Sequence, residues 1–250
     1  MNRGPRSEGR DADPLRAELE ELLALTAHEL HEPLRKIATF GQLLRDRSGE
    51  VLDAESLDYV TRMERAAVRM RSTLDCVIAL ARVPRGLPFV TIDLGEVVSS
   101  AIGKLRPHLD GSQAAVHVAD LPSIEGDPFQ MQQLFEHLLD NAVKFHREGV
   151  APVIHVDAIA APGGDKAEIR VADNGQGFDD VHAERIFLPF ERLHGRGKYP
   201  GAGLGLAICR KIAERHGAEL TARGAPGEGA IVTLTVRTRP PRPPLAGEGP

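Results

Sequence analysis

The segment Pro14–Arg47, PLRAELEELLALTAHELHEPLRKIATFGQLLRDR, has the repeating pattern of a helix that packs against other helices. Its apolar positions recur at intervals of seven residues, the spacing of the d and a rows of a coiled coil or helical bundle. One row is formed by Leu23, Leu30, Ile37 and Leu44, and the other by Leu19, Thr26, Pro33 and Phe40. Pro33 lacks a backbone donor and predicts a bend within the helix.

Ser48-Gly49 ends this helix, and a second helix is expected over Ala54–Arg82. Its apolar residues, spaced alternately by three and four, are Val60, Met63, Ala67, Met70, Leu74, Val77 and Ala81. Two helices alone do not enclose a core, so the hairpin predicts a dimeric four-helix bundle built with a second copy of the chain. The alternative is that the hairpin packs on the C-terminal part of its own chain.

The composition excludes several classes of protein. The chain has 250 residues, and 31 Lys and Arg against 36 Asp and Glu give a net charge of −5, which disfavours a nucleic-acid binder. Cys76 and Cys209 are far apart and predict neither a disulfide framework nor a cysteine zinc site. No apolar run approaches the roughly 18 residues of a membrane span, and the polar N-terminus has no signal core. These features predict a cytoplasmic chain without a membrane span.

The chain is expected to be an α+β protein in five parts. These are a flexible N-terminus (1–13), the helical hairpin (14–83), a linker marked by Pro84, Gly86 and Pro88 (84–88), a second domain (89–238) and a Pro-rich tail (239–250). In the second domain, strands are expected at 89–92, 115–118, 153–160, 166–172, 220–223 and 230–237, helices at 94–109, 128–146 and 204–216, and a long loop at 175–203. This order predicts an α/β sandwich, with the helices on one face of a largely antiparallel sheet.

A histidine motif, His28-Glu29-Leu30-His31-Glu32-Pro33-Leu34, lies within the first helix. His28 falls at heptad position f and His31 at position b, so both are expected to be exposed. A neutral imidazole is a competent nucleophile, and the neighbouring Glu29 could orient the ring or accept its proton. Ordinary surface histidines would fit the same residues.

Polar side chains on the expected helix 128–146 form a second motif. Asn141 and Lys144 are three residues apart and so share a face. An amide oxygen beside an ammonium suits Mg²⁺ and a phosphate, because Mg²⁺ takes hard oxygen ligands. A plain polar stripe on an amphipathic helix is the alternative.

Two glycine-rich segments complete the set. Asp173-Asn174-Gly175-Gln176-Gly177 follows a strand, where glycines permit close backbone approach and a carboxylate can accept from an exocyclic amine such as that of adenine. The run 201–208, GAGLGLAI, opens a helix whose free N–H groups favour an anion. An ordinary turn explains the first segment equally well. The run 201–208 lacks the Gly-Lys-Ser/Thr of a P-loop and does not lie in a parallel strand–helix–strand unit.

The order and spacing of these segments resemble those of two-component sensor histidine kinases over about residues 15–238. The His28 motif looks like the H box of that family, Asn141 and Lys144 like its N box, and Asp173, Gly175 and Gly177 like its first glycine box. Phe187-Leu188-Pro189-Phe190 is similar to the F box, and Gly201–Gly205 to the second glycine box.

The resemblance implies a homodimeric protein histidine kinase with a Bergerat-type ATP-binding domain. It implies that His28, assisted by Glu29, attacks the γ-phosphate of ATP, and that the phosphoryl group then passes to an aspartate of a response-regulator receiver domain. The residues implied to bind ATP, with Asn141 also holding Mg²⁺, are Asn141, Lys144, Asp173, Gly175, Gly177, Phe190, Gly201, Gly203, Leu204 and Gly205. Lid cations Arg192, Arg196 and Lys198 are implied to be available to the triphosphate.

Three features depart from the family pattern. His137 stands where these kinases usually have Asn, and Glu32 where strong phosphatases of the family have Thr or Asn. The third is that no sensory, transmembrane or receiver domain is expected in this sequence, so a signal would have to come from a separate sensory partner or from a segment outside it. A non-catalytic scaffold with a degraded nucleotide pocket is therefore a second reading, and a related ATPase or serine-type kinase, which needs no dimeric phosphoacceptor helix, is a third.

Overall fold

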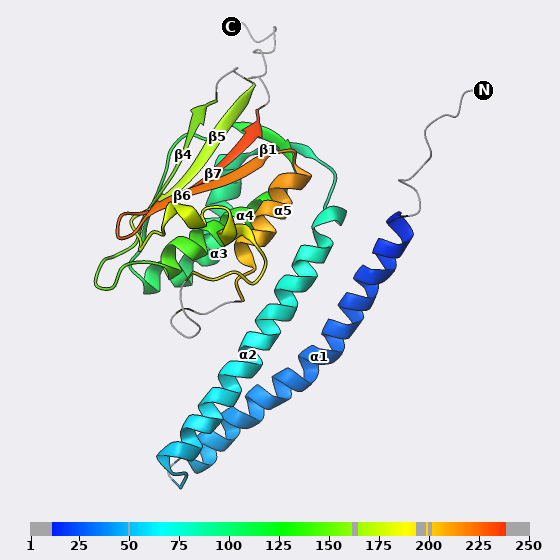
Figure 1. The fold of residues 1–250 in the computed structure, drawn as a ribbon, viewed down its shortest axis with the longest axis vertical. Helices are drawn as coiled ribbons and strands as arrows, with labels where there is room; N and C mark the ends of the chain where they lie inside the picture. Colours follow the sequence, from blue (N-terminus) through cyan, green and yellow to red (C-terminus); the bar gives the residue numbers. More distant parts are fainter. Residues whose placement is uncertain (1–11, 50, 162–164, 194–198, 200–201, 239–250) are drawn as a thin grey trace, which may run out of the picture. The chain divides into compact units, whose positions relative to one another are not determined.

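The computed structural model describes residues 12–49, 51–161, 165–193, 199 and 202–238, without the side chains of 12–21, 24, 28 and 85. The contacts divide the chain into two compact units, a helical unit that ends at Arg82 and a mixed unit that begins at Val83 (Figure 1). Residues 1–11 of the expected flexible start (1–13) and the Pro-rich tail over 239–250 lie outside the described residues, whereas Ala12 and Asp13 already belong to the first helix. Within the described part of the chain, no helix is long and apolar enough to cross a bilayer.

The helical unit is a hairpin of α1 (Ala12–Ser48) and α2 (Ala54–Arg82), and α1 continues through Pro33 as one helix. Among the described side chains, the buried positions of α1 are Ala27, Leu34 and Gly41, and those of α2 are Val60 and Ala67. These residues are mostly small, which lets the two backbones approach closely.

Gly41 shows how close the two helices come. A Cβ atom at Gly41 would lie 2.7 Å from Cγ of Glu64, whose carboxylate pairs with Arg45 at 2.9 Å. Only glycine therefore admits Glu64 at this level of the hairpin. The resulting ion pair helps to fix how α1 and α2 are aligned.

The inner row of the hairpin differs from the rows that the heptad pattern singled out. Leu30, Ile37, Leu44 and Phe40, which belong to those rows, are 43–66% exposed in the single chain. The row Ala27, Leu34, Gly41 also has a spacing of seven, but two of its members are too small to stand out as apolar. The predicted rows thus stay on the surface of one chain.

The mixed unit is an α+β sandwich, as predicted. Its five-stranded sheet has the order β2-β4-β5-β7-β6, in which only the β2–β4 pair is parallel. The strands are β2 (Ala115–Val118), β4 (Val153–Ala160), β5 (Lys166–Asp173), β6 (Glu219–Ala225) and β7 (Gly229–Arg237). The helices α3 (Leu94–Gly111), α4 (Pro128–Lys144) and α5 (Gly205–Arg215) lie on one face of this sheet (Figure 1).

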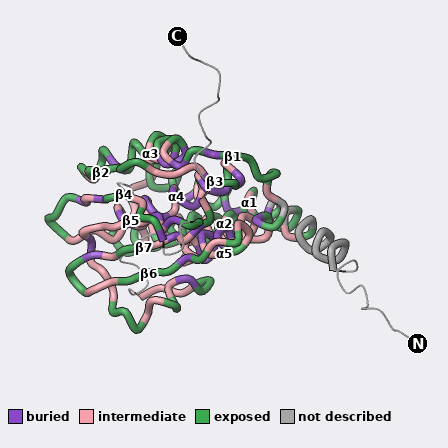
Figure 2. Tube along the Cα trace, turned by 90° about the horizontal axis from the view of Figure 1, so that it is seen from above, coloured by how far each residue is buried: buried purple, intermediate pink, exposed green. Residues whose placement is uncertain are grey.

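Capping and burial explain the positions of these helices. Asp93 caps α3 and Asp127 caps α4, each accepting hydrogen bonds from two backbone N–H groups of the first turn. Buried segments gather where the helices meet the sheet (Figure 2). The large side chains that are fully buried there include Leu94, Met131, Leu134, Phe135, Leu139, Ile154, Ile169, Ile208, Ile212 and Leu234.

Several boundaries differ from the sequence expectations. A small second sheet pairs β1 (Val90–Asp93) with β3 (Ser123–Gly126), and β3 was missed because four residues between Pro122 and Asp127 carry no alternation. Helix α4 ends at Lys144 rather than at 146, and α5 begins at Gly205. The expected loop 175–203 contains two short 3-10 helices, η2 (Asp180–His182) and η3 (Arg185–Phe187).

Candidate functional site

The end of α4 and the turn that follows β5 lie together in the mixed unit. The backbone N–H of Gln176 donates to the carbonyl of Phe145 at 2.9 Å, and its side-chain amide donates to the carbonyl of His146 at 3.2 Å. Asn141 lies one turn earlier on α4, and among the described residues its side chain has no hydrogen-bond partner. The ammonium of Lys144 lies 4.8 Å above the Phe145 ring. The N-box residues and the first glycine segment are thus neighbours.

Glycine is required at both glycine positions of this turn. A Cβ atom at Gly175 would lie 2.7 Å from both Oδ1 of Asp173 and the carbonyl oxygen of Phe145. Gly177 has φ +62°, and a Cβ there would lie 1.9 Å from the carbonyl oxygen of Ala225. The turn therefore keeps a close-packed backbone.

Asp173 presents a half-buried carboxylate at the end of β5. Its Oδ1 accepts hydrogen bonds from the N–H groups of Gly175 at 2.8 Å and Ala230 at 3.3 Å. Among the described residues, Oδ2 accepts no hydrogen bond. Burial raises the pKa of Asp173, although the two N–H donors oppose the shift. The second oxygen is therefore available to a donor on a ligand.

The sequence analysis did not identify the residues that contact and stabilise the turn after β5. Arg147 donates to the carbonyl of Asn174 at 2.9 Å and to that of Gly227 at 3.0 Å. Gly229 has φ +99°, and a Cβ there would lie 1.9 Å from the carbonyl oxygen of Asp173. The Pro-Gly-Glu-Gly segment between β6 and β7 was a turn signal, but it did not reveal which turn it contacts.

The second glycine segment reaches the N-terminus of α5. Gly203 has φ +73°, and its carbonyl accepts from the N–H of Phe190 at 2.9 Å; Phe190 also has a positive φ of 65° and an exposed ring. Leu204 is fully buried and makes no side-chain cap, so the first N–H groups of α5 from Gly205 on are left for another partner. Gly201 lies outside the described residues.

His137 links this helix to α4. A Cβ atom at Gly205 would lie 3.4 Å from Nδ1 of His137, while Nε2 of the same ring is buried without a hydrogen-bond partner. Burial lowers the pKa of His137, against the attraction of Asp140 and Glu136, so the ring is neutral. His137 and Asn141 are four residues apart and so lie on one face of α4. The structure thereby brings the N-box face next to the second glycine segment.

Part of the long loop 175–203 is held by contacts with the rest of the mixed unit. The ring of Tyr199 lies edge-on to Phe145 with centroids 5.0 Å apart, and its hydroxyl group is hydrogen-bonded to the Gln176 side chain. Arg192 donates to the carbonyl of Tyr199 at 2.6 Å. The other two lid cations, Arg196 and Lys198, lie outside the described residues.

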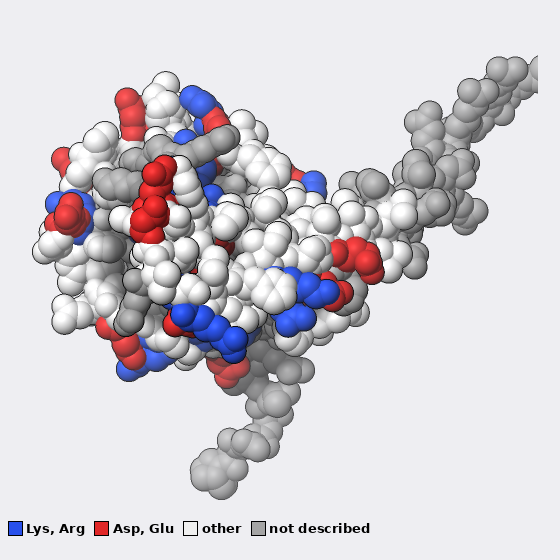
Figure 3. All heavy atoms as spheres, turned by 90° about the horizontal axis from the view of Figure 1, so that it is seen from below, with Lys and Arg blue, Asp and Glu red and all other residues white. Residues whose placement is uncertain are grey.

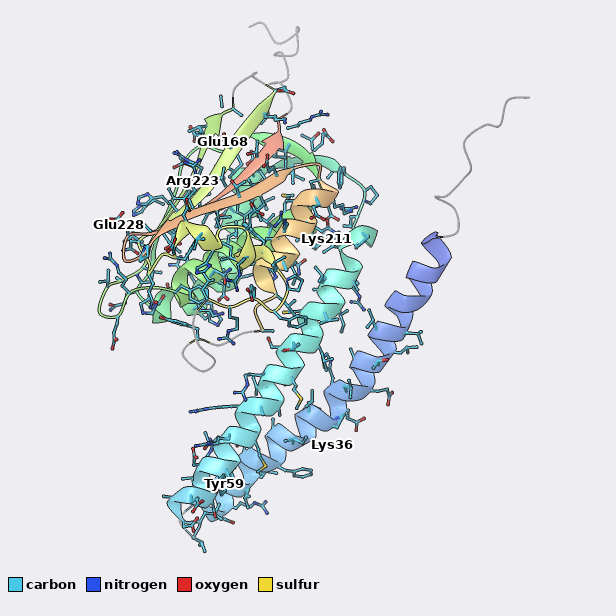
Figure 4. The ribbon with its side chains drawn as sticks, in the orientation of Figure 1. Lys36, Tyr59, Glu168, Lys211, Arg223 and Glu228 are labelled. Carbon is cyan, nitrogen blue, oxygen red and sulfur yellow. The ribbon has the colours of Figure 1, made fainter. Side chains whose placement is uncertain are left out.

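The histidine motif lies on α1 in the helical unit. The backbone of His28 is helical, and its side chain is outside the described residues; Glu29 is exposed. Lys36, labelled in Figure 4, pairs with Glu32 one turn earlier at 2.6 Å. His31 is less exposed than expected: its side chain is 31% exposed, and its Nε2 lies 3.2 Å from the carboxylate of Asp75 on α2.

The comparisons with known proteins agree with this geometry. Residues 18–86 match the His Kinase A phospho-acceptor domain, and residues 126–240 match the histidine kinase-, DNA gyrase B- and HSP90-like ATPase family. Cyanobacterial phytochrome A of a Nostoc species is 34% identical over 90% of this chain, and sensor histidine kinase ZraS of Klebsiella oxytoca is 31% identical over 86%.

The solved structure of full-length ShkA in complex with AMPPNP is also similar, at 26% identity over 88% of this chain and 46% of that one, with a TM-score of 0.64. The chain spans 29% of the phytochrome and 45% of ZraS. The two matched domains lie in the order, and over the residues, where the structure has the helical hairpin and the α/β sandwich. The chain therefore has the phospho-acceptor domain and the histidine kinase-like ATPase domain of a sensor histidine kinase core.

Proposed function

We propose that the chain is an ATP-dependent protein histidine kinase that phosphorylates its own His28 and passes the phosphoryl group to an aspartate of a response-regulator receiver domain. The observation that carries this proposal is the close-packed glycine turn with the unpartnered Oδ2 of Asp173, next to the Asn141 face of α4. The phospho-acceptor domain match over 18–86 supports the role of the helical hairpin. It also argues against a plain ATPase or a serine-type kinase.

Each part of the nucleotide has a proposed contact. Oδ2 of Asp173 accepts from the exocyclic amine of adenine. Gly175 and Gly177 let the turn after Asp173 pack closely against its neighbours, which holds the carboxylate in place. The free N–H groups at the start of α5, behind Gly203 and Leu204, receive the phosphates. Lys144 adds positive charge, and Phe190 and Gly201 belong to the segments that close over the nucleotide.

The residues of α4 also fit Mg²⁺. The amide oxygen of Asn141 is a hard ligand without a partner among the described residues, as Mg²⁺ prefers. His137 adds an unpartnered neutral nitrogen on the same face, which suits hydrogen bonding to water or phosphate better than ligation of Mg²⁺. When bound, Mg²⁺ neutralises negative charge on the triphosphate.

The transfer itself needs a nucleophile and a base. A ring nitrogen of neutral His28 forms a bond to the γ-phosphorus, the bond from that phosphorus to the bridging oxygen breaks, and ADP leaves with the electron pair. Glu29, the next residue on the exposed side of α1, orients the imidazole or accepts its proton. Positioning and charge neutralisation contribute most of the rate in phosphoryl transfer.

The direct test is incubation with γ-labelled ATP and Mg²⁺, followed by acid and base treatment. We expect label that is stable to base and labile to acid, because phosphohistidine has this behaviour. Binding of ATP without any label would contradict the proposal and favour a scaffold with a degraded pocket. The neutral His137 in place of the usual Asn is the feature that would then explain the loss.

We also propose that the hairpin forms a homodimer. Both helices carry exposed apolar side chains on the outside of the hairpin, among them Leu30, Ile37, Phe40, Leu44, Met63 and Met70. Exposed apolar side chains along both helices of a hairpin commonly mark an interface, and a second copy of the hairpin would cover them as a four-helix bundle. On the face shown in Figure 3 acidic and basic side chains are both present and much of the surface is uncharged, so charge does not indicate a nucleic-acid partner there.

The double substitution Met63→Asp with Met70→Asp is expected to separate the dimer. Both residues are about half exposed in the single chain, so the monomer tolerates charge there, whereas a dimer would bury it without a partner. Light scattering should report twice the chain mass for the wild type and one chain mass for the variant. Val51→Asp, in the loop at the tip of the hairpin, is the matched control and should remain dimeric. A wild type that scatters as a single chain at all concentrations contradicts the proposal.

A further inference from the structure

The sequence predicts a linker over 84–88, but the structure holds this stretch, with Val83 and Phe89 at its two ends, on the mixed unit. Val83–Arg85 forms a 3-10 turn, η1, and the carbonyl of Val83 accepts from the side-chain amide of Gln130 at 2.7 Å. The carbonyl of Leu87 accepts from Nη2 of Arg215 at 2.8 Å. Both donors come from the catalytic fold, Gln130 from α4 and Arg215 from the end of α5. The chain is therefore tied down before its first strand begins.

The group that holds this segment is built from buried polar residues. Arg215 donates through Nη1 to Oε1 of Gln130 at 2.9 Å and to Oδ2 of Asp127 at 3.3 Å. Asp127 is 1% exposed and Gln130 is 7% exposed. Asp127 also caps the N-terminus of α4, which fixes the position of its carboxylate in the cluster.

Gly86 lies directly against this cluster. A Cβ atom at Gly86 would lie 2.2 Å from Nε2 of Gln130, 2.4 Å from Oδ2 of Asp127 and 2.7 Å from Nη1 of Arg215. Any side chain at position 86 must therefore push the segment away from the cluster. The glycine is needed for contact and not for a turn, because its φ is not positive.

Phe89, the last residue of the segment, packs against the end of α5. Its ring stacks on His216 with centroids 4.5 Å apart and an angle of 13°, and the guanidinium of Arg215 lies 4.8 Å from its centroid. Nε2 of His216 accepts from the N–H of Asp127 at 2.9 Å, while Nδ1 lies 2.8 Å from the carbonyl of Ile212. Arg215 and His216 thus hold Phe89 from neighbouring positions of one helix end.

The fold does not need these contacts in order to begin at Val90, because β1 is already fixed by its pairing with β3. If released, seven residues would form a tether with a root-mean-square span of about 15 Å. The effective concentration of a tethered group falls as the tether lengthens beyond the distance it must cover. When the segment is held, the flexible part of the connection between the helical unit and the mixed unit is therefore very short.

We propose that Arg215 is a positioning residue, which together with Gly86 fixes Val83–Phe89 on the catalytic unit so that the joint between the two units is confined to Arg82–Val83. The inference rests on the proposed kinase function, because the short joint raises the rate at which the catalytic unit delivers phosphate to His28. Nucleotide binding does not depend on it, since none of these side chains belongs to the proposed ATP site.

The test uses Arg215→Ala and Gly86→Ala in the full chain, with Lys211→Ala as the matched control. Lys211 lies on the same helix, one turn before Arg215, and pairs with the exposed Glu214 at 2.9 Å. Trypsin cleavage after Arg85 reports release of the segment, calorimetry reports ATP affinity, and labelling rates give kcat and KM. We expect faster cleavage after Arg85 in both variants, unchanged ATP affinity and KM, and a fall in kcat of about three- to tenfold.

The control should behave as the wild type, and Arg215→Lys should recover part of kcat, because one ammonium can reach Asp127 but cannot donate to Leu87 as well. Unchanged cleavage in both variants would overturn the proposal, and so would faster cleavage with unchanged kcat. If Arg215→Ala unfolds because Asp127 is left unpaired, Gly86→Ala decides, since it keeps that pair. If the wild type takes up no label, both the kinase function and the proposed effect of the segment on the labelling rate are overturned. The trypsin cleavage rates still show whether Arg215 and Gly86 hold the segment on the mixed unit.

Discussion

His28→Gln should abolish phosphorylation of the chain while dimerisation and ATP affinity stay at wild-type levels. His28 is followed on α1 by the exposed Glu29, which supplies a base beside it. His31 is the only other histidine within one turn, and its Nε2 already faces the carboxylate of Asp75 at 3.2 Å. This nitrogen is buried and makes no hydrogen bond among the described residues, so it is poorly accessible to the γ-phosphate of ATP. The measurement is the base-stable label acquired from γ-labelled ATP.

His31→Gln is the matched control, one turn away on the same helix, and it should keep substantial labelling. Glu29→Gln should retain the acceptor but slow the transfer, by the roughly 10²–10⁴-fold typical of losing a positioned acid–base group. If His28→Gln still acquires base-stable label at the wild-type rate, His28 is not the acceptor. Loss of label in His31→Gln alone would move the assignment to His31.

The parts of the structure that sequence reasoning predicted are those with a local signal. The β4–β5 hairpin follows from two apolar runs joined by a Pro-Gly-Gly turn, and the strand pairing confirms it. Gly175 and Gly177 stood out because they follow a strand, and both glycines are required there by close backbone contacts. The start of α4 at Pro128 agrees with the helix expected over 128–146, and the structure shows that Asp127 caps it.

The parts that could not be predicted depend on partners far apart in the chain. Arg215 and Asp127 are 88 residues apart, and nothing near either residue indicates that they meet over Gly86. The same composition of Pro84, Gly86 and Pro88 that marks a free linker also allows a segment to lie flat on a surface. Arg147 looked like one surface cation among many until its two backbone acceptors were placed beside it.

The prediction of the inner face of the hairpin was wrong for a different reason. Apolar periodicity ranks residues by size and hydrophobicity, so it selected Leu30, Ile37 and Phe40 over Ala27 and Gly41. Close helix packing needs small residues, and these carry a weak signal. Two rows of residues therefore share the spacing of seven. One row packs inside the hairpin, and we propose that the other packs against the second copy of the chain.

Asp173→Asn is expected to weaken ATP binding by about tenfold to a hundredfold, the equivalent of losing a hydrogen bond to a charged group worth about 1.5–3 kcal/mol. The substitution keeps an oxygen that can accept from Gly175 and Ala230, so the turn should stay folded. It replaces the unpartnered Oδ2 with an NH₂ group, which would face the exocyclic amine of adenine as one donor facing another. GTP should bind the wild type poorly, because its carbonyl at that position would face the carboxylate.

Asp157→Asn is the matched control, because Asp157 pairs with Arg170 at 2.7 Å on neighbouring strands and has no proposed contact with ATP. Calorimetry should give wild-type affinity for the control, and thermal unfolding should show that both variants are folded. Burial raises the pKa of Asp173, so on acidification its carboxyl should become neutral at a higher pH than an ordinary aspartate does. Wild-type affinity for ATP should therefore fall over that range, while the Asp173→Asn variant should not show this fall. Equal affinities of wild type and Asp173→Asn for ATP would remove Asp173 from the site.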